Sequence, residues 1–342
     1  MIYLQVSAYG STTGFVPGTT IYLEGSFASG IIIDLSKSFG SATSKLRITS
    51  LNPSSPATIA SSSHGIYISA ATGTAKGLGI QIDNVVITSS GGSGMYGIYL
   101  LAPAGIRLDT LVVDSVDISG FAQGMRTWRA SASTPFVINV IVSNSKFHNN
   151  AAGGILLGGT AGATITGCEA SWNSWNGPGI SGTDSDLMTI TNCNSHDNMG
   201  IGYTIAEGMT NSVISNCKSV SNYYAAYVVI GRNLVSMNNG GAVNNAVFKD
   251  SNSTNDGLGY KFVINGIWTD GIMAATNVAF ENMNILNSGG GATTGYFGTG
   301  VFDAYWLVGS FNMTTKNVVF TFPSVTYSAD LTCDSAFSTL CI

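Results

Sequence analysis

The chain of 342 residues carries a formal net charge of −5, and only 9% of its residues are charged, against roughly 25% in an average globular chain. Lys and Arg number only 13 and form no basic cluster, which excludes a nucleic-acid-binding surface. No apolar run approaches the ~20 residues that a membrane-spanning helix needs. A surface made mostly of hydroxyl and amide side chains suits contact with sugars, close packing against other proteins and an extracellular location.

Residues 1–50 are predicted to form the entrance coils of a solenoid. A turn at Pro17 and Gly18 precedes a short alternating run, and β-branched runs follow at 31–35 and 45–49, as expected for strands separated by turns. The first six residues lack the basic end and apolar core of a signal peptide. We therefore expect either that a leader is removed or that the protein leaves the cell by another route, for example within a virion.

Between residues 140 and 231, four segments repeat without gaps, and looser copies lie on both sides. They end in Asn150, Asn173, Asn198 and Asn222, which recur after 23, 25 and 24 residues. Such a period, built from strands and polar turns, predicts a solenoid whose coils stack ~4.8 Å apart. Equal positions then form ladders, and we expect the Asn ladder to shape a turn because Asn tolerates left-handed backbone and bonds its own turn.

Cysteines mark a second repeated position. Cys168, Cys193 and Cys217 hold the same place in three successive repeats, which predicts a stack of small buried thiols. Cys333 and Cys341 lie near the C-terminus, where they either pair with each other or remain free.

The turn and short strands from Pro17 onward resemble the start of right-handed parallel β-helix proteins of the pectate-lyase-like superfamily, and the resemblance covers most of the chain. It implies an all-β fold, a right-handed parallel β-helix solenoid of about ten or more coils. We expect this β-helix over residues 1–320 and a C-terminal strand or cap over 321–342. The superfamily includes lyases, hydrolases, epimerases, phage tailspikes and adhesins, so the resemblance predicts the fold more sharply than the function.

Four charged residues stand beside the repeat without belonging to it. Asp184 and Asp186 follow one repeat strand, Glu207 follows the next and Arg232 the one after. Stacked coils would bring Asp184 and Glu207 to about 5–7 Å from each other, within the range for paired catalytic carboxylates. The alternative is that all four are solvated turn charges.

Aromatic residues near that edge are predicted to bind a sugar chain. The aromatic candidates are Tyr203, Tyr227 and Tyr260 on the strands and Trp172 and Trp175 in a turn, and Lys261 beside Tyr260 is a further candidate. The alternative is that the tyrosines are ordinary outward residues and that the tryptophans pack against a neighbouring chain.

A second candidate for acid–base chemistry is His196-Asp197, with His148 two coils away; exposed turn histidines are the alternative. No metal site is predicted from the repeats. The one possible cofactor is calcium, held by oxygen atoms of Asp250, Asn252, Asn255 and Asp256, although the spacing matches neither an EF-hand nor a nonapeptide calcium repeat.

Three functions remain open. The first is an extracellular or virion-surface β-helix protein, similar to tailspikes or fibres, that binds polysaccharide and could also cleave it. The second is a purely structural or adhesive β-helix without activity, and the third is a secreted polysaccharide lyase or glycoside hydrolase. We expect a polysaccharide or cell-surface glycan as partner, no nucleic acid, no membrane span, and assembly as a homo-oligomer such as a trimer or within a larger surface structure.

Overall fold

The computed structural model describes residues 18–34, 43–69, 78–89, 95–102, 108–129, 137–174, 178–183, 185–206, 208–231, 243–256, 267–271, 275–286, 305–307, 310–311, 313–322, 325–329 and 332–333. Every regular element in these residues is a β-strand. Within the same residues there is no helix long and apolar enough to cross a membrane.

The strands form three sheets that run side by side along the molecule. The first, sheet A, contains β1 (Thr20–Leu23), β4 (Leu46–Ser50), β7 (Leu78–Asp83), β10 (Leu108–Asp114), β13 (Val137–Ser143), β16 (Ala163–Thr166), β19 (Met188–Thr191), β22 (Thr210–Ser215), β25 (Asn244–Lys249), β28 (Ala275–Glu281), β31 (Ser310–Phe311), β32 (Met313–Lys316) and β35 (Thr332–Cys333). Sheet B contains β2 (Ser26–Phe27), β5 (Ala57–Ser61), β8 (Val85–Ser89), β11 (Asp117–Ser119), β14 (Lys146–His148), β17 (Glu169–Ser171), β20 (Asn194–His196), β23 (Lys218–Val220), β26 (Asn252–Thr254), β29 (Asn284–Leu286), β33 (Val318–Phe322) and β34 (Val325–Ala329). Sheet C contains β3 (Ile31–Asp34), β6 (Ile66–Ser69), β9 (Tyr96–Ala102), β12 (Gln123–Arg129), β15 (Gly153–Gly158), β18 (Ile180–Thr183), β21 (Ile201–Ala206), β24 (Ala225–Gly231), β27 (Ile267–Gly271) and β30 (Tyr305–Leu307).

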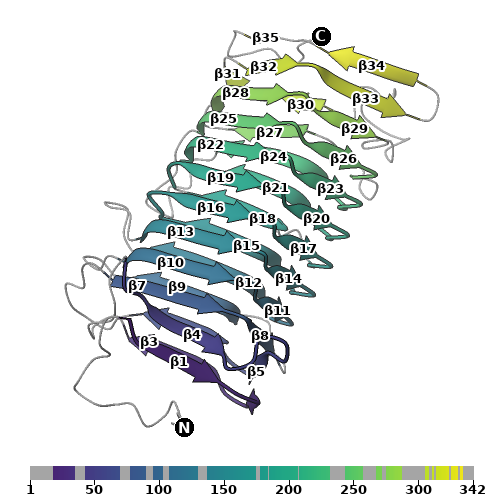
Figure 1. Ribbon diagram of the computed structural model, residues 1–342. Coiled ribbons are helices and arrows are strands. Elements are labelled where there is room, and N and C mark those ends of the chain that lie inside the picture. The colour runs from purple at the N-terminus through teal and green to yellow at the C-terminus, as the bar shows by residue number, and fades with distance from the viewer. Residues whose placement is uncertain are drawn as a thin grey trace.

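From β1 to β30, each coil of the chain contributes one strand to each sheet, in the order A, B, C, before the next coil begins (Figure 1). Neighbours within a sheet therefore come from successive coils and pair in parallel, as β10 does with β13 and β11 with β14. Sheet C has ten strands in the described residues, one for each coil. The predicted right-handed parallel β-helix of about ten or more coils is confirmed.

The strands form because each alternates inward and outward side chains. In β16, Ala163 and Ile165 are buried, whereas Thr164 and Thr166 point outward. Stacking the coils places such residues above one another and gives one continuous apolar core along the axis. No single coil could bury this face alone, so the core depends on the stack.

The predicted Asn ladder is buried at the turns between sheets B and C. Asn173 Oδ1 accepts hydrogen bonds from the backbone N–H and the side-chain amide of Asn150 (3.1 and 3.0 Å), and Asn173 Nδ2 donates to Phe147 O (3.0 Å). Asn198 and Asn222 repeat the pattern one coil further on each time. The structural role of the ladder is thus confirmed.

The left-handed backbone, however, is not at the ladder residues, and that part of the prediction is wrong. Positive φ falls on the residue before each of them, at Asn149, Trp172, Asp197 and Ser221. The ladder residues instead form hydrogen bonds with buried backbone groups of neighbouring coils. Leaving such groups without a partner would cost free energy.

The cysteine column is confirmed. Cys168, Cys193 and Cys217 are free thiols with side chains that are almost fully buried. Each Sγ lies near backbone carbonyls of its own turn and of the previous coil. Cys341 lies outside the described residues, so its pairing with Cys333 stays a prediction.

The strand pairing at the C-terminal end of the stack differs from the pairing in the rest of it. β34 pairs antiparallel with β33, and β35 pairs antiparallel with β32. These reversals cover parallel edges that would otherwise be open to another chain. The predicted boundary between the β-helix and a cap at residue 320 stays a prediction.

Candidate functional site

Two tyrosines predicted to contact a sugar are core residues instead. Tyr203 and Tyr227 have no exposed surface and occupy the inward column that Ile155 and Ile180 hold in earlier coils. Their rings stack at a centroid distance of 5.3 Å, and the Tyr203 hydroxyl donates to Lys218 O while that of Tyr227 donates to Asn252 O. Burial raises the pKa of both phenols well above the ordinary value. The prediction that these rings line a groove is therefore wrong.

Asp186 is the one described member of the predicted charged edge. Its Oδ1 accepts hydrogen bonds from Thr210 Oγ1, from Asn211 Nδ2 (2.9 Å) and from the Leu187 N–H (2.9 Å). Burial alone would raise the pKa of Asp186, but these hydrogen bonds outweigh it and hold the pKa below its ordinary value. An ionised carboxylate that accepts three hydrogen bonds at a turn stabilises that turn.

The other predicted edge and sugar-binding residues lie outside the described residues: Asp184, Glu207, Arg232, Tyr260, Lys261 and Trp175. The described residues before Asp184 and Glu207 are Thr183 and Ala206, and these two are register partners in β18 and β21. The roles predicted for the six residues stay predictions.

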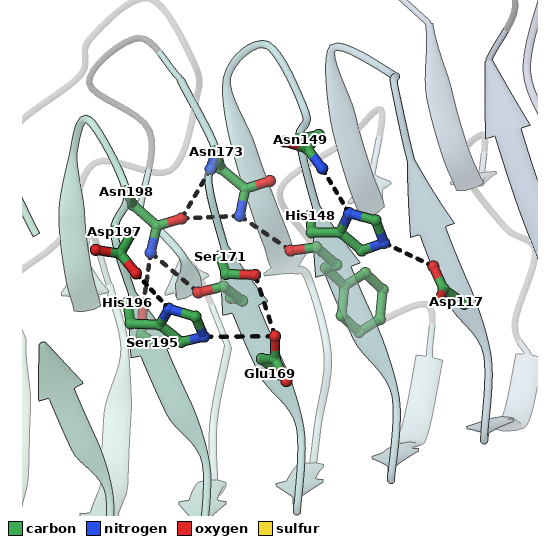
Figure 2. A network of polar contacts seen from close by, with 12 residues as sticks. Asp117, His148, Asn149, Glu169, Ser171, Asn173, Ser195, His196, Asp197 and Asn198 are labelled. Carbon is green, nitrogen blue, oxygen red and sulfur yellow. Dashed lines mark hydrogen bonds and ion pairs between the residues drawn. The ribbon is translucent and has the colours of Figure 1, made fainter.

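The outward face of sheet B holds two pairs of a histidine and an acidic residue from adjacent coils (Figure 2). The first pair is His148 on β14 and Asp117 on β11, with Nε2 and Oδ1 2.8 Å apart. Asn149 Nδ2 lies 2.8 Å from His148 Nδ1. Because an amide nitrogen can only donate, Nδ1 accepts and Nε2 carries the proton that bonds Asp117.

The second pair repeats this arrangement two coils further along. His196 on β20 lies with Nε2 3.4 Å from Glu169 Oε1 on β17, and its Nδ1 is 2.8 Å from Asp197 Oδ2. Ser171 Oγ donates to the same Glu169 oxygen (3.2 Å). His196 and Asp197 are neighbours in sequence and in contact, whereas Asp117 and Glu169 are not among the predicted site residues.

An exposed tryptophan stands in the coil between those of His148 and His196. Trp172 follows β17 directly, is 60% exposed, and lies in register between Asn149 and Asp197. Its φ is +54°, a left-handed conformation that bulky residues rarely adopt. The same turn position in other coils holds Asn149, Asp197, Ser221 and Asn255, residue types that adopt this conformation more easily.

The surface formed by Asp117, His148, Glu169, Trp172 and His196 is here called the Trp172 surface. Each imidazole nitrogen already has a neighbour, so both histidines hold their acids in place rather than offering a free base. The groups that remain to contact a ligand are the second oxygen of each carboxylate and the tryptophan ring. Carboxylates accept hydrogen bonds from hydroxyl groups, and an exposed indole offers an apolar face. The surface is thus equipped to bind a molecule rich in hydroxyl groups.

Two acids of this surface also have a spacing of chemical interest. Asp117 and Glu169 occupy the same strand position two coils apart, with Lys146 between them. Two coil spacings are roughly 10 Å, close to the upper limit of about 9.5 Å for the carboxyl pair of inverting glycosidases. The repeat alignment places Asp117, Lys146 and Glu169 in one column, and this is the sequence signal that could have revealed the pair.

The possible calcium ligands do not converge. Asp256 is fully buried and accepts hydrogen bonds from Asn222 and Ser253, whereas Asp250 stands in an exposed turn and accepts one from Asn282. Among the described residues, no group of three or more His, Cys, Asp or Glu side chains is arranged to hold a metal ion. Asp256 instead occupies the next position of the Asn ladder.

Three parallel sheets with one strand per coil, an inward apolar column and a polar outer face define the class of right-handed parallel β-helix proteins. The model of the family "Right handed beta helix region" matches residues 65–321. The chain belongs to this family. No curated protein sequence matches it.

Several solved structures are similar to this chain at low sequence identity. The catalytic domain of a GH87 alpha-1,3-glucanase, in complex with tetrasaccharides, has a TM-score of 0.51 and 16% identity over 87% of this chain and 53% of that one. The chain therefore spans about half the length of that protein. An endo-xylogalacturonan hydrolase from Aspergillus tubingensis has a TM-score of 0.45 and 13% identity, covering 91% and 85% of the two chains. Tailspike protein 3 of bacteriophage CBA120 has a TM-score of 0.38 and 11% identity, covering 92% and 62%.

Proposed function

We propose that this protein binds a polysaccharide along the outer face of sheet B, through the Trp172 surface. The observation that carries the proposal is Trp172 itself, a large apolar ring that is 60% exposed in a left-handed turn position. Strained residues persist where the surrounding structure or a function demands them, and the neighbouring coils show that the turn does not require Trp. Glu169 in the same coil and Asp117 two coils earlier supply the hydrogen-bond acceptors that sugar hydroxyl groups need.

The location proposed for this activity is outside the cell or on a virion surface. Support comes from the surface chemistry, since 9% charged residues leave an outer face dominated by hydroxyl and amide groups. The similar glucanase holds tetrasaccharides, so a β-helix is a fold that can bind sugar chains. A homo-oligomer, for example a trimer, is part of the same proposal.

Cleavage of the bound chain is a second candidate function. The specific observation in its favour is the column of Asp117 and Glu169 two coils apart on one face. In an inverting hydrolysis one of them would protonate the leaving oxygen and the other would activate water. The charged edge around Asp184, Glu207 and Arg232 stays an alternative place for such chemistry, and an adhesive β-helix without activity stays the alternative function.

The test is a polysaccharide panel assayed for binding and for release of reducing ends and unsaturated uronates. We expect the wild type to bind at least one glycan and the double variant Asp117→Asn, Glu169→Gln to bind it at least about tenfold more weakly, because charge-assisted hydrogen bonds are lost. Asp250→Asn, which removes an exposed carboxylate from another turn, is the matched control and should bind as the wild type does. Failure of the wild type to bind any glycan would contradict the proposal.

The same assay separates binding from cleavage. Release of reducing ends by the wild type that the double variant abolishes would establish the hydrolytic function. Binding without release would leave a binding protein.

A further inference from the structure

A second cluster of polar and aromatic residues lies on the outer face of sheet C, in the N-terminal half of the stack. Its members are half-buried: His64, Tyr67, Tyr96, Tyr99, Arg126 and Trp128. Tyr67, Tyr99 and Arg126 are register partners in β6, β9 and β12 and so form one outward column. We call these six residues the Arg126 cluster. It belongs to a different sheet from the Trp172 surface.

The rings of the cluster pack on one another. Tyr96 and Tyr99 have centroids 4.4 Å apart, and Tyr67 stacks on Tyr99 at 5.5 Å. His64 stacks on Tyr96 at 5.4 Å, and its Nδ1 accepts a hydrogen bond from the Tyr96 backbone N–H (3.1 Å). Burial lowers the pKa of His64 below its ordinary value, so this ring is neutral at physiological pH. Arg126 is then the one cation of the cluster.

Arg126 is held in place but its hydrogen-bonding capacity is not filled. Its guanidinium carbon lies 4.5 Å from the Trp128 ring centroid and 5.4 Å from that of Tyr96, and Nη1 donates to the Tyr96 hydroxyl (2.8 Å). Its Nε is buried without an acceptor. A buried N–H left without a partner costs about 1–3 kcal/mol, and such groups are rare in folded proteins. Because Nε has almost no accessible surface, a ligand has to be bound by the terminal nitrogens, of which Nη2 has no hydrogen bond to the described part of the chain. Guanidinium N–H groups bind carboxylate, sulfate or phosphate oxygens in pairs.

In the part of the chain that the structure describes, no acidic side chain lies close enough to pair with Arg126. The sequence segments that flank β6, β9 and β12 contain neither Asp nor Glu: 70–77, 90–94, 103–107 and 130–136. A guanidinium that is held between two aromatic rings and has no ion pair among the described residues is placed to take an anion from outside the chain.

We propose that the Arg126 cluster binds the anionic group of an acidic sugar, a carboxylate or a sulfate ester, with the sugar ring against the aromatic side chains. The guanidinium provides the charge and the paired N–H donors, while Trp128 and the tyrosines fix its plane and offer apolar contact. The carbohydrate part of this assignment rests on the proposed function, whereas the binding of an anion stands on the Arg126 geometry alone.

The experiment is titration calorimetry of the full chain with three oligosaccharide probes. Oligogalacturonides carry carboxylates, the same oligosaccharides after carboxyl reduction are neutral, and carrageenan oligosaccharides carry sulfate esters. We expect at least one anionic probe to bind, the neutral probe to bind at least about tenfold more weakly, and the affinity to fall with added salt. Arg126→Gln should lose at least about tenfold for the anionic probe, and Arg126→Lys, which keeps the charge without the planar fork, should lose part of it.

Trp172→Asn separates the two proposals, because it alters only the Trp172 surface. We expect this variant to retain the anion-dependent part of the binding. Equal binding of charged and reduced probes, no binding of either anionic probe, or wild-type affinity in Arg126→Gln would each overturn the Arg126 proposal. If Trp172→Asn loses glycan binding and Arg126→Gln does not, the proposed function stands and the Arg126 proposal is overturned.

Discussion

Trp172 occupies a backbone conformation that costs most residues about 1–2 kcal/mol and that glycine and asparagine adopt most easily. Four other coils place Asn, Asp or Ser at the same turn. Trp at this position therefore trades stability for an exposed ring. A bulky residue that strains the backbone and leaves most of its surface exposed is best explained by a ligand.

The left-handed backbone at Trp172 predicts that a substitution there stabilises the fold. Trp172→Asn should raise the free energy of unfolding by about 1 kcal/mol, because asparagine relieves the left-handed strain. Chemical denaturation with a fluorescence or circular-dichroism readout measures the change. Leu187→Asn is a matched comparison, since Leu187 also has positive φ, is 58% exposed and precedes a column of asparagines in the following coils. A loss of stability in Trp172→Asn would show that the ring is held by packing and not by function.

Individual residues were predicted unevenly from the sequence. Cys168, Cys193 and Cys217 were assigned correctly because a small residue repeated in register belongs to a stacked column. Tyr203 and Tyr227 were misassigned because their aromatic rings continue a column of isoleucines, and each hydroxyl finds a backbone carbonyl within the stack. Alternation along one strand identifies the inward face, but it does not show that a polar tip has a partner in the next coil.

At the scale of the structural elements, the buried Asn ladder ends in a carboxylate. Asp256 Oδ1 accepts hydrogen bonds from the N–H and side-chain amide of Asn222 (2.8 and 2.9 Å), as an asparagine would, and its Oδ2 accepts one from Ser253 (2.6 Å). Burial raises the pKa of Asp256 to about 6, although these hydrogen bonds oppose the shift. The ladder thus carries a charge at its C-terminal end that its other members avoid.

The raised pKa makes the stability of the fold depend on pH. The folded state binds the proton of Asp256 more tightly than the unfolded state, so this contribution to stability is complete below pH ~4 and is lost as the pH rises through about 6. A shift of two units corresponds to roughly 3 kcal/mol. Asp256→Asn should therefore stabilise the protein at pH 8 and have little effect at pH 4.

Thermal or urea unfolding of the wild type and Asp256→Asn at both pH values measures this difference. Asp250→Asn removes an exposed carboxylate from the preceding turn and controls for the change in net charge. A gain of the same size at pH 4 and pH 8 would contradict the burial of an ionised Asp256.

The geometry of the Trp172 surface explains why the contacts between its acids and histidines are not predicted from the repeat. Asp117 meets His148, and Glu169 meets His196, on a diagonal between adjacent coils. A repeat alignment compares equal positions and so finds ladders, whereas a diagonal contact joins the first residue of one short strand to the last residue of the next. His196 and Asp197 were recognised because they are adjacent in sequence.

At the scale of the whole molecule, the repeat determined almost all that could be predicted of the architecture. A period in the twenties, with β-branched runs between polar turns, predicts coils, and the coils give three parallel sheets around one core. The function is harder to predict from the sequence. Side chains on the long outer faces of a solenoid do not have to fit the core, so the repeat does not determine which residues stand there. The two proposed binding surfaces lie on different sheets, B and C, and each depends on residues that depart from the repeat.

The central claim is that Trp172 is exposed to hold a sugar chain, and the affinity of Trp172→Asn for the glycan that the wild type binds tests it most directly. The measurement is made beside Leu187→Asn, which relieves the same backbone strain at a turn that leads into sheet A. The account predicts at least about a tenfold loss of affinity in Trp172→Asn, despite its greater stability, and unchanged affinity in Leu187→Asn. Wild-type affinity in Trp172→Asn would contradict it.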